Sequence, residues 1–267
     1  MLQSAAEHFR RQQQITAEGL RAAARVRADL RRLTSVVTLY QQTMTTDALA
    51  GVADMLAEQH LNAPLEARVN PAGISGVASD GRPLDSLLDV ARQSDKLGFA
   101  LIVTTQLKDA ARVSAGISIA ARPKVQGYVR MISPPCCPRC AILAGKYFRW
   151  NAGFARHPNC DCRHIPAAED RADDMRTDPT ALFKSGQVRG LTKAETKAIS
   201  QGADLGRVVN ARRSMYVDPA GRRLTREATT RRGGVRGPRP TPEQIYRDAG
   251  DDRDAAIRSL KRFGYLF

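Results

Sequence analysis

Seven side chains that can bind a metal ion fall in one short stretch near the middle of the chain. They are Cys136, Cys137, Cys140, His157, Cys160, Cys162 and His164. The stretch holds all five cysteines of the 267 residues. Disulfide frameworks spread their cysteines along a chain so that distant loops are joined, whereas clustered cysteines are typical of metal sites. The clustering therefore predicts a metal ion.

The spacing of these residues indicates which ion and which ligands. Cys137 and Cys140 have the CxxC spacing that lets two thiolates bind one ion from a tight turn. His157, Cys160 and Cys162 follow after a gap of sixteen residues. Zinc takes four such ligands, so we expect one Zn2+ on Cys137, Cys140, Cys160 and Cys162, with His157 as the substitute for Cys160. Seven candidates compete for four positions, so the ligand set stays open, and five thiols without metal are the alternative.

The same residues favour a structural zinc ion over a catalytic one, with no catalytic residues. Four thiolates would complete the zinc shell and leave no open position for water. A zinc hydrolase usually needs a carboxylate base beside the metal. Asp161 is the only acidic residue between Arg122 and Ala168, and it stands between two expected ligands. Few bulky residues surround the cluster, and we expect Trp150 to belong to its small core.

The charge of the chain points to a polyanionic partner. Lys and Arg outnumber Asp and Glu by 42 to 27, a net charge of +15. Phosphate backbones bind such surfaces by releasing counterions. A generally basic surface that docks on acidic proteins is the alternative. Ten arginines, set among glycines and prolines, predict an extended basic arm over residues 206–240 that contacts DNA without sequence preference: Arg207, Arg212, Arg213, Arg222, Arg223, Arg226, Arg231, Arg232, Arg236 and Arg239.

No segment is long and apolar enough to cross a membrane. A span needs about 20 apolar residues, and runs such as Phe99–Val103 are far shorter. The first residues also lack the apolar core of a secretion signal. We therefore expect no membrane partner and synthesis in a cytoplasm, where thiols stay reduced.

The elements that must position the cysteines are mostly helical, and the predicted fold class is α+β, mostly α. Residues 1–62 read as a helical arm, because apolar residues from Leu30 to Met44 recur at three- and four-residue steps. We expect the helix to break at 45–47. We expect the arm to be exposed and to dock on another chain, with His8 and His60 at its surface.

Residues 63–122 form the second expected segment, a linker followed by helices that pack on the cysteine region. Asn and Gly with Pro mark a loop to Gly81, and Pro83 can open a short helix. A longer helical pattern runs over 94–121 and ends at Arg122-Pro123. The helices would lead directly into the cysteine region.

The third expected segment, 123–170, is a small zinc-binding knuckle with strands at 126–132, 146–150 and 163–165. The fourth, 171–267, is helical. Thr192 and Glu195 have the spacing of a capping box for a helix through Ser200. A further helix is predicted near 205–213, and a helix pair near the end would dock through Ile245, Ala249, Ala256, Leu260 and Phe263.

The cysteine pattern resembles the signature of the Mu F-like minor head (minor capsid) proteins of tailed bacteriophages. The chain has the CxxC, then Leu143-Ala144-Gly145, then His157-Pro158-Asn159-Cys160-Asp161-Cys162. Order and spacing match over 122–166, and the likeness to the actinobacteriophage branch covers most of the chain. Asp161 departs from other branches, which often carry Arg there, and this weakens any contact of that spot with phosphate. Cys136 lies outside the pattern.

The resemblance implies a low-copy structural protein inside the virion head, made in the bacterial host cytoplasm. It implies portal and capsid proteins as partners, packaged double-stranded DNA as a non-specific contact, and a role in head assembly or in genome packaging and delivery. It implies no enzymatic activity.

Two other functions compete with this reading. A metal-dependent nuclease would use His157 or His164 as base beside Arg156 and Arg163, but the further His, Asn or acidic residue of such a site is missing. A free nucleic-acid-binding zinc module would need a base-reading helix after the ligands, which is missing at C2H2 spacing, or aromatic stacking platforms, which are sparse.

Overall fold

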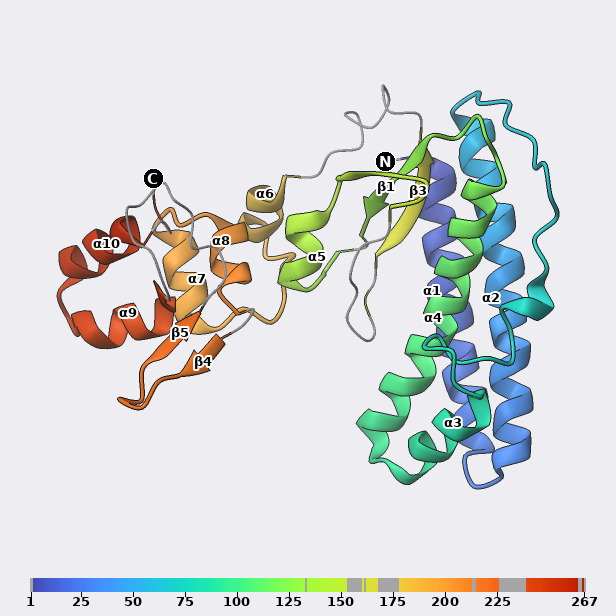
Figure 1. The fold of residues 1–267 in the computed structure, drawn as a ribbon, viewed down its shortest axis with the longest axis horizontal. Helices are drawn as coiled ribbons and strands as arrows, with labels where there is room; N and C mark the ends of the chain where they lie inside the picture. The colour runs from blue at the N-terminus through green and yellow to red at the C-terminus, as the bar shows by residue number, and fades with distance from the viewer. Residues whose placement is uncertain are drawn as a thin grey trace. The chain divides into compact units, whose positions relative to one another are not determined.

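Helices dominate the computed structural model, which describes residues 2–132, 134–152, 160, 162–167, 178–212, 215–225, 239–263 and 266 (Figure 1). The chain divides into two compact units. Unit 1 is Met1–Ser133 with Ala144–Thr177, and unit 2 is Pro134–Leu143 with Asp178–Phe267. Long helices at the N-terminus, small sheets and a helical C-terminal part confirm the α+β, mostly α class.

Three long helices form the body of unit 1. They are α1 (Gln3–Arg25), α2 (Leu30–Glu58) and α4 (Lys96–Ala120), which lie side by side in Figure 1, with the short α3 (Leu84–Gln93) against α2 and α4. Asp29 and Asp95 cap α2 and α4 by accepting hydrogen bonds from Arg32 N and Gly98 N. Their shared core includes Phe9, Leu33, Met44, Met55, Val103 and Leu107.

The N-terminal helices are therefore not an exposed arm, and that prediction is wrong. Small residues where α1 contacts α2 and α4 explain why the pattern of apolar residues in the first helix is weak. Ala5 and Ala23 are fully buried, and a Cβ on Gly19 would lie 2.7 Å from a Leu107 methyl carbon and 2.9 Å from the Tyr40 ring. Close helix approach through small residues buries surface without a stripe of large apolar side chains.

Two further details of the N-terminal prediction also need correction. The break falls at residues 26–29, and α2 runs unbroken through 45–47. Thr45 is tolerated there because it is buried against α4, where Ser114 Oγ donates to its hydroxyl at 3.0 Å. His8 is only 3% exposed, because its ring packs on Gly51 and pairs with Asp47. His60 is exposed as expected.

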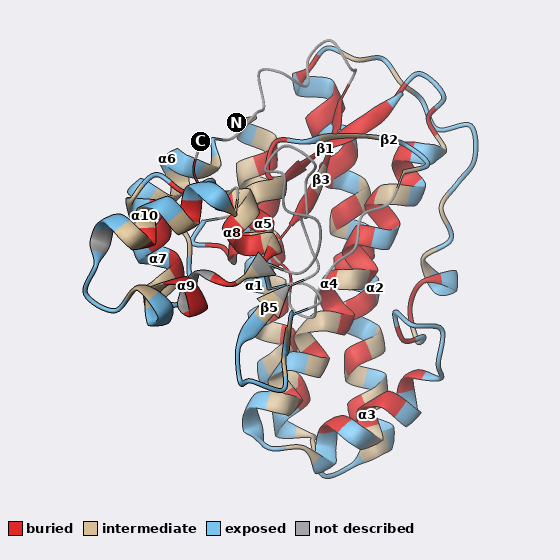
Figure 2. Ribbon diagram, turned by 60° about the vertical axis from the view of Figure 1, so that its left-hand side comes forward, coloured by how far each residue is buried: buried red, intermediate tan, exposed pale blue. Residues whose placement is uncertain are grey.

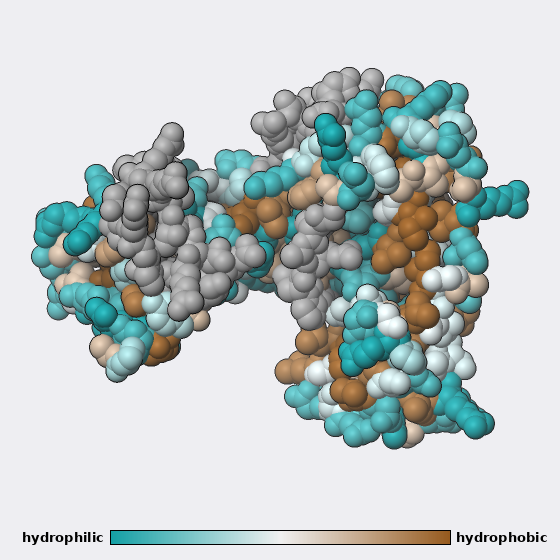
Figure 3. All heavy atoms as spheres, viewed as in Figure 1, coloured by the Kyte–Doolittle hydropathy of each residue, from teal (hydrophilic) through white to brown (hydrophobic). Residues whose placement is uncertain are grey.

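The linker prediction is confirmed. Residues 59–83 contain only a 3-10 turn at Pro71–Gly73 and an isolated bridge between Val77 and Pro83. The helix after it begins at Leu84 with Pro83 at the N-cap. Apolar side chains remain exposed on α4, including Leu97, Leu101, Val113 and Ile117, and brown side chains gather over this part of unit 1 in Figure 3.

A three-stranded antiparallel sheet packs on the helices of unit 1. Its strands are β1 (Gly127–Met131), β2 (Tyr147–Arg149) and β3 (Arg163–Ala167), in the order β2-β1-β3. Val129 pairs with both Tyr147 and Ile165. Figure 2 shows β1 and β3 coloured as buried. All three predicted strands are confirmed, and β3 extends two residues further than expected.

Trp150 does not belong to the core of this sheet, contrary to expectation, since it is 53% exposed. The bulk of the core comes from β1 and β3, where Tyr128, Val129, Met131 and Ile165 are buried. The Tyr128 ring stacks on Phe148 at 5.6 Å between centroids.

Unit 2 is made of short helices and a second small sheet. The helices are α5 (Pro138–Leu143), α6 (Pro179–Lys184), α7 (Lys193–Ser200), α8 (Leu205–Asn210), α9 (Pro242–Ala249) and α10 (Arg253–Arg262). The strands β4 (Met215–Val217), β5 (Arg223–Thr225) and β6 (Arg239–Pro240) pair antiparallel in that order. Both the capping box at the start of α7 and the terminal helix pair are confirmed.

Among the described helices, none has the length and apolar character that a membrane crossing requires.

Candidate metal centre

The first cysteine pair belongs to unit 2 and lies at the start of α5. The helix begins at Pro138, between the two cysteines. The turn brings the Cys140 backbone N–H to the Cys137 sulfur, with 3.4 Å between N and Sγ. Cys140 is buried and Cys137 half-buried. This is the tight turn that the CxxC spacing predicted.

The second pair belongs to unit 1 and lies just before β3. The sulfurs of Cys160 and Cys162 are 2.9 Å apart, and both side chains are fully buried. A disulfide has about 2.05 Å between its sulfurs, so the two thiols are close without being bonded. Two buried thiols this close together are soft ligands of the kind that zinc accepts.

Two buried arginines hold this second pair. Arg130, from β1, is 1% exposed and donates from Nη2 to Cys160 Sγ at 3.7 Å. Arg112, from α4, is 2% exposed and donates from Nε to the Cys162 carbonyl at 2.9 Å. Its Nη1 also pairs with Asp109 at 2.6 Å. Buried positive charge offsets the negative charge that a metal-binding sulfur carries.

Reasoning from the sequence missed both arginines. The available signal was their position, because Arg130 interrupts the apolar strand QGYVRMI and Arg112 lies on the inward face of a helix. A charge at an apolar position is buried only where it has partners.

The other candidates near the pairs have structural contacts. His164 lies in β3, as expected, with its ring 4.3 Å from that of Tyr128. The Cys136 backbone donates to Gln187 O at 2.9 Å and accepts from Arg189 N at 2.8 Å. Arg163, which the nuclease alternative requires at a phosphate, is 5% exposed and donates to Cys162 O at 3.2 Å. His157, Arg156 and Asp161 lie outside the described residues.

All five cysteines are described, and no disulfide joins any of them. Within the described ranges, no group of three or more His, Cys, Asp or Glu side chains is placed to hold an ion. The structure thus shows two close cysteine pairs, while a metal ion bound by them is a proposal.

The expected DNA-binding arginines have varied surroundings in unit 2. Arg212 forms an ion pair with Glu195, whose side chain is 3% exposed, and donates to Gly190 O at 2.8 Å. Arg222 pairs with Asp218 at 2.6 Å, and this hydrogen bond raises the pKa of Arg222 and lowers that of Asp218. Arg207 lies in α8, Arg223 is exposed in β5, and Arg239 lies in β6.

The basic segment is therefore in part ordered structure rather than an extended arm throughout, because 215–217, 223–225 and 239–240 pair as strands. Arg213, Arg226, Arg231, Arg232 and Arg236 lie outside the described residues. DNA contact by any of the ten stays a prediction.

Compared with known proteins, the chain matches no family model, no curated protein and no solved structure.

Proposed function

We propose that this chain is a minor structural protein of a tailed-phage head, similar to the Mu F-like minor head proteins, with one structural Zn2+. The observation that carries the proposal is the order and spacing of CxxC followed by HPNCDC. The arrangement of each cysteine pair supports it, since the first lies in a tight turn and the second is a pair of adjacent buried thiols.

The proposed zinc ligands are Cys137, Cys140, Cys160 and Cys162, with His157 as the substitute for Cys160. Thiolates are the ligands that zinc prefers in closed, structural sites. When bound, the ion supplies folding free energy, which reaches roughly 10–16 kcal/mol in finger-sized domains. Arg130 supports this role because its buried positive charge lies beside Cys160.

Metal analysis of the purified protein tests the zinc site. We expect one zinc ion per chain, and a loss of zinc when any one of the four cysteines is replaced by Ser. Cys136→Ser is the matched control, because this buried cysteine lies outside the proposed set. His157→Ala separates the two ligand sets, since it reduces zinc content only if His157 replaces Cys160. Normal folding of a zinc-free protein would contradict the site.

Mass spectrometry of purified particles tests the role in the head. The protein should be present at low copy in full heads, together with portal and capsid proteins. Its absence from them would refute a structural role. The net charge of +15 supports non-specific contact with packaged DNA. The nuclease alternative predicts plasmid nicking that His164→Ala abolishes.

A further inference from the structure

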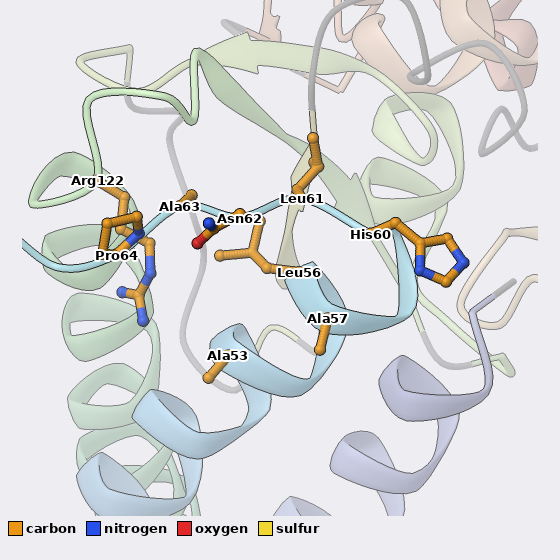
Figure 4. Close-up of a pocket in the computed structure, with 9 residues that line it drawn as sticks. All are labelled: Ala53, Leu56, Ala57, His60, Leu61, Asn62, Ala63, Pro64 and Arg122. Carbon is orange, nitrogen blue, oxygen red and sulfur yellow. The ribbon is translucent and has the colours of Figure 1, made fainter.

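A recess of about 520 Å³ lies in unit 1, where the ends of α2 and α4 meet the start of the linker. Figure 4 shows the residues around it. Ala53, Leu56, Ala57 and Pro64 give it apolar walls, while Asn62 and Arg122 supply polar groups. Ala53, Ala57, Asn62 and Pro64 are exposed, so a ligand can enter from solvent without a rearrangement of the helices.

Arg122 is the unusual member of this recess. It is only 6% exposed. Its Nη1 donates to Ser118 O at 2.9 Å and to the Ser118 hydroxyl, but its Nε is buried without a hydrogen-bond partner. Among the described residues no carboxylate forms an ion pair with it, and burial lowers its pKa with no opposing charge.

The hydrogen bonds to Ser118 offset only part of the cost of burying the positive charge of Arg122. Arg122 follows the last turn of α4, where a helix end carries about half a negative charge. The guanidinium carries a full positive charge, so roughly half of it is left without compensation by this estimate. A buried and uncompensated charge is costly. An anion in the recess would remove that cost.

We propose that this recess binds a carboxylate carried on a short apolar group. The Arg122 guanidinium and the Asn62 amide would donate to the carboxylate, and the side chains of Leu56 and Ala57 would contact the hydrocarbon. In Figure 4 the side chains of Arg122 and Asn62 lie at the same end of the recess, whereas the His60 ring points away from them. One cation and one amide match a monoanion better than a phosphate dianion, which needs more donors.

The same chemistry can come from two sources, a free short-chain acid or the acidic side chain of a peptide. Sodium butyrate and the capped peptide acetyl-Ala-Glu-Ala-amide serve as the two probes. Binding is followed by NMR through the Nε–H signal of Arg122, assigned by its loss in Arg122→Lys. We expect saturable shifts with butyrate and none with butylamine or butanol.

Matched variants locate the binding. Arg122→Gln removes the charge and should weaken butyrate binding about tenfold or more, as loss of a charge-assisted pair does. Since that variant lacks the reporter signal, and can also fail to fold, calorimetry measures its binding and Ala57→Leu provides a second test. The larger side chain fills the recess from an exposed position and keeps Arg122. Lys124→Gln removes an exposed cation two residues away and should bind like the wild type.

The two probes then separate the sources. Tighter binding of the peptide assigns the recess to an acidic side chain, and equal or tighter binding of butyrate assigns it to a free acid. The proposal is overturned by shifts that do not saturate, by phosphate binding as tightly as butyrate, or by wild-type affinity in Ala57→Leu.

Discussion

Arg130 and Cys160 are buried partners in unit 1, with 3.7 Å between the guanidinium Nη2 and the sulfur. Arg130, from β1, thus places a fixed positive charge beside a proposed zinc ligand. The charge is in place before any ion arrives, so the proposed site includes more than its four sulfurs.

Replacing Arg130 should therefore weaken zinc binding. We expect Arg130→Met to raise the zinc Kd by about 10- to 100-fold, the usual effect of losing a group that supports a ligand. Arg130→Lys should recover part of the affinity because it keeps the charge. Competition with a chromophoric chelator measures the Kd. Arg149→Met, at an exposed position of the same sheet, is the control, and an unchanged Kd in Arg130→Met would refute the role.

Asp47 should make unit 1 sensitive to acid. Burial would raise the pKa of Asp47, but hydrogen bonds and charges from His8 and Arg11 outweigh burial and lower it. Because the folded pKa lies below the unfolded value, the carboxylate stabilises the fold above about pH 4, and this stability is lost as the pH falls further.

Urea unfolding of Asp47→Asn at several pH values checks this expectation. At pH 7 the variant should lose about 1–3 kcal/mol, and its difference from the wild type should shrink below pH 4. Asp54→Asn is the control, since Asp54 is 56% exposed and lies 3.7 Å from Arg11. A constant difference across the pH range would show that the charge of Asp47 is unimportant.

Gly51 and Gly116 should respond in opposite ways to replacement by alanine. A Cβ on Gly51 would lie 2.4 Å from His8 Nδ1, so Gly51→Ala should destabilise unit 1 by about 1–3 kcal/mol. A Cβ on Gly116 would meet only His164 atoms, at 4.0 Å. Gly116→Ala should therefore stabilise α4 by about 0.5–1 kcal/mol through helix propensity. Thermal unfolding of both variants tests the contrast, which equal effects would disprove.

The Arg212–Glu195 pair should stabilise unit 2. Glu195 is buried and caps α7, so Arg212→Ala would leave a buried carboxylate without its cation. We expect the free energy of unfolding to fall by about 1–3 kcal/mol. The loss is smaller than for a fully buried pair, because Arg212 is 38% exposed. Arg222→Ala removes a cation that is 58% exposed, so it should cost much less stability than Arg212→Ala. Chemical denaturation distinguishes the two, and equal losses would contradict the assignment.

Arg223 offers a cleaner test of DNA contact than Arg212. It is exposed in β5, so Arg223→Ala should leave unfolding unchanged. If it meets a phosphate, the slope of log affinity against log salt for duplex DNA should fall by about 1. Fluorescence anisotropy at several salt concentrations measures the slope. An unchanged slope would exclude Arg223 from the DNA surface.

The sequence by itself determined the local features of this protein. The capping box at Thr192 and the CxxC turn depend on residues close together in the chain, and both were predicted correctly. Such signals are local because the hydrogen bonds that satisfy them are local.

The tertiary structure decided which surfaces are buried. The N-terminal helices pack inside unit 1 because small residues such as Ala5 and Gly19 let α1 approach α2 and α4. His8 and Arg130 can be buried because Asp47 and Cys160 supply polar partners for them. These partners lie 39 and 30 residues away in the sequence, so no local pattern indicates the burial. A polar side chain is buried only where distant residues supply partners, and that depends on how the elements pack.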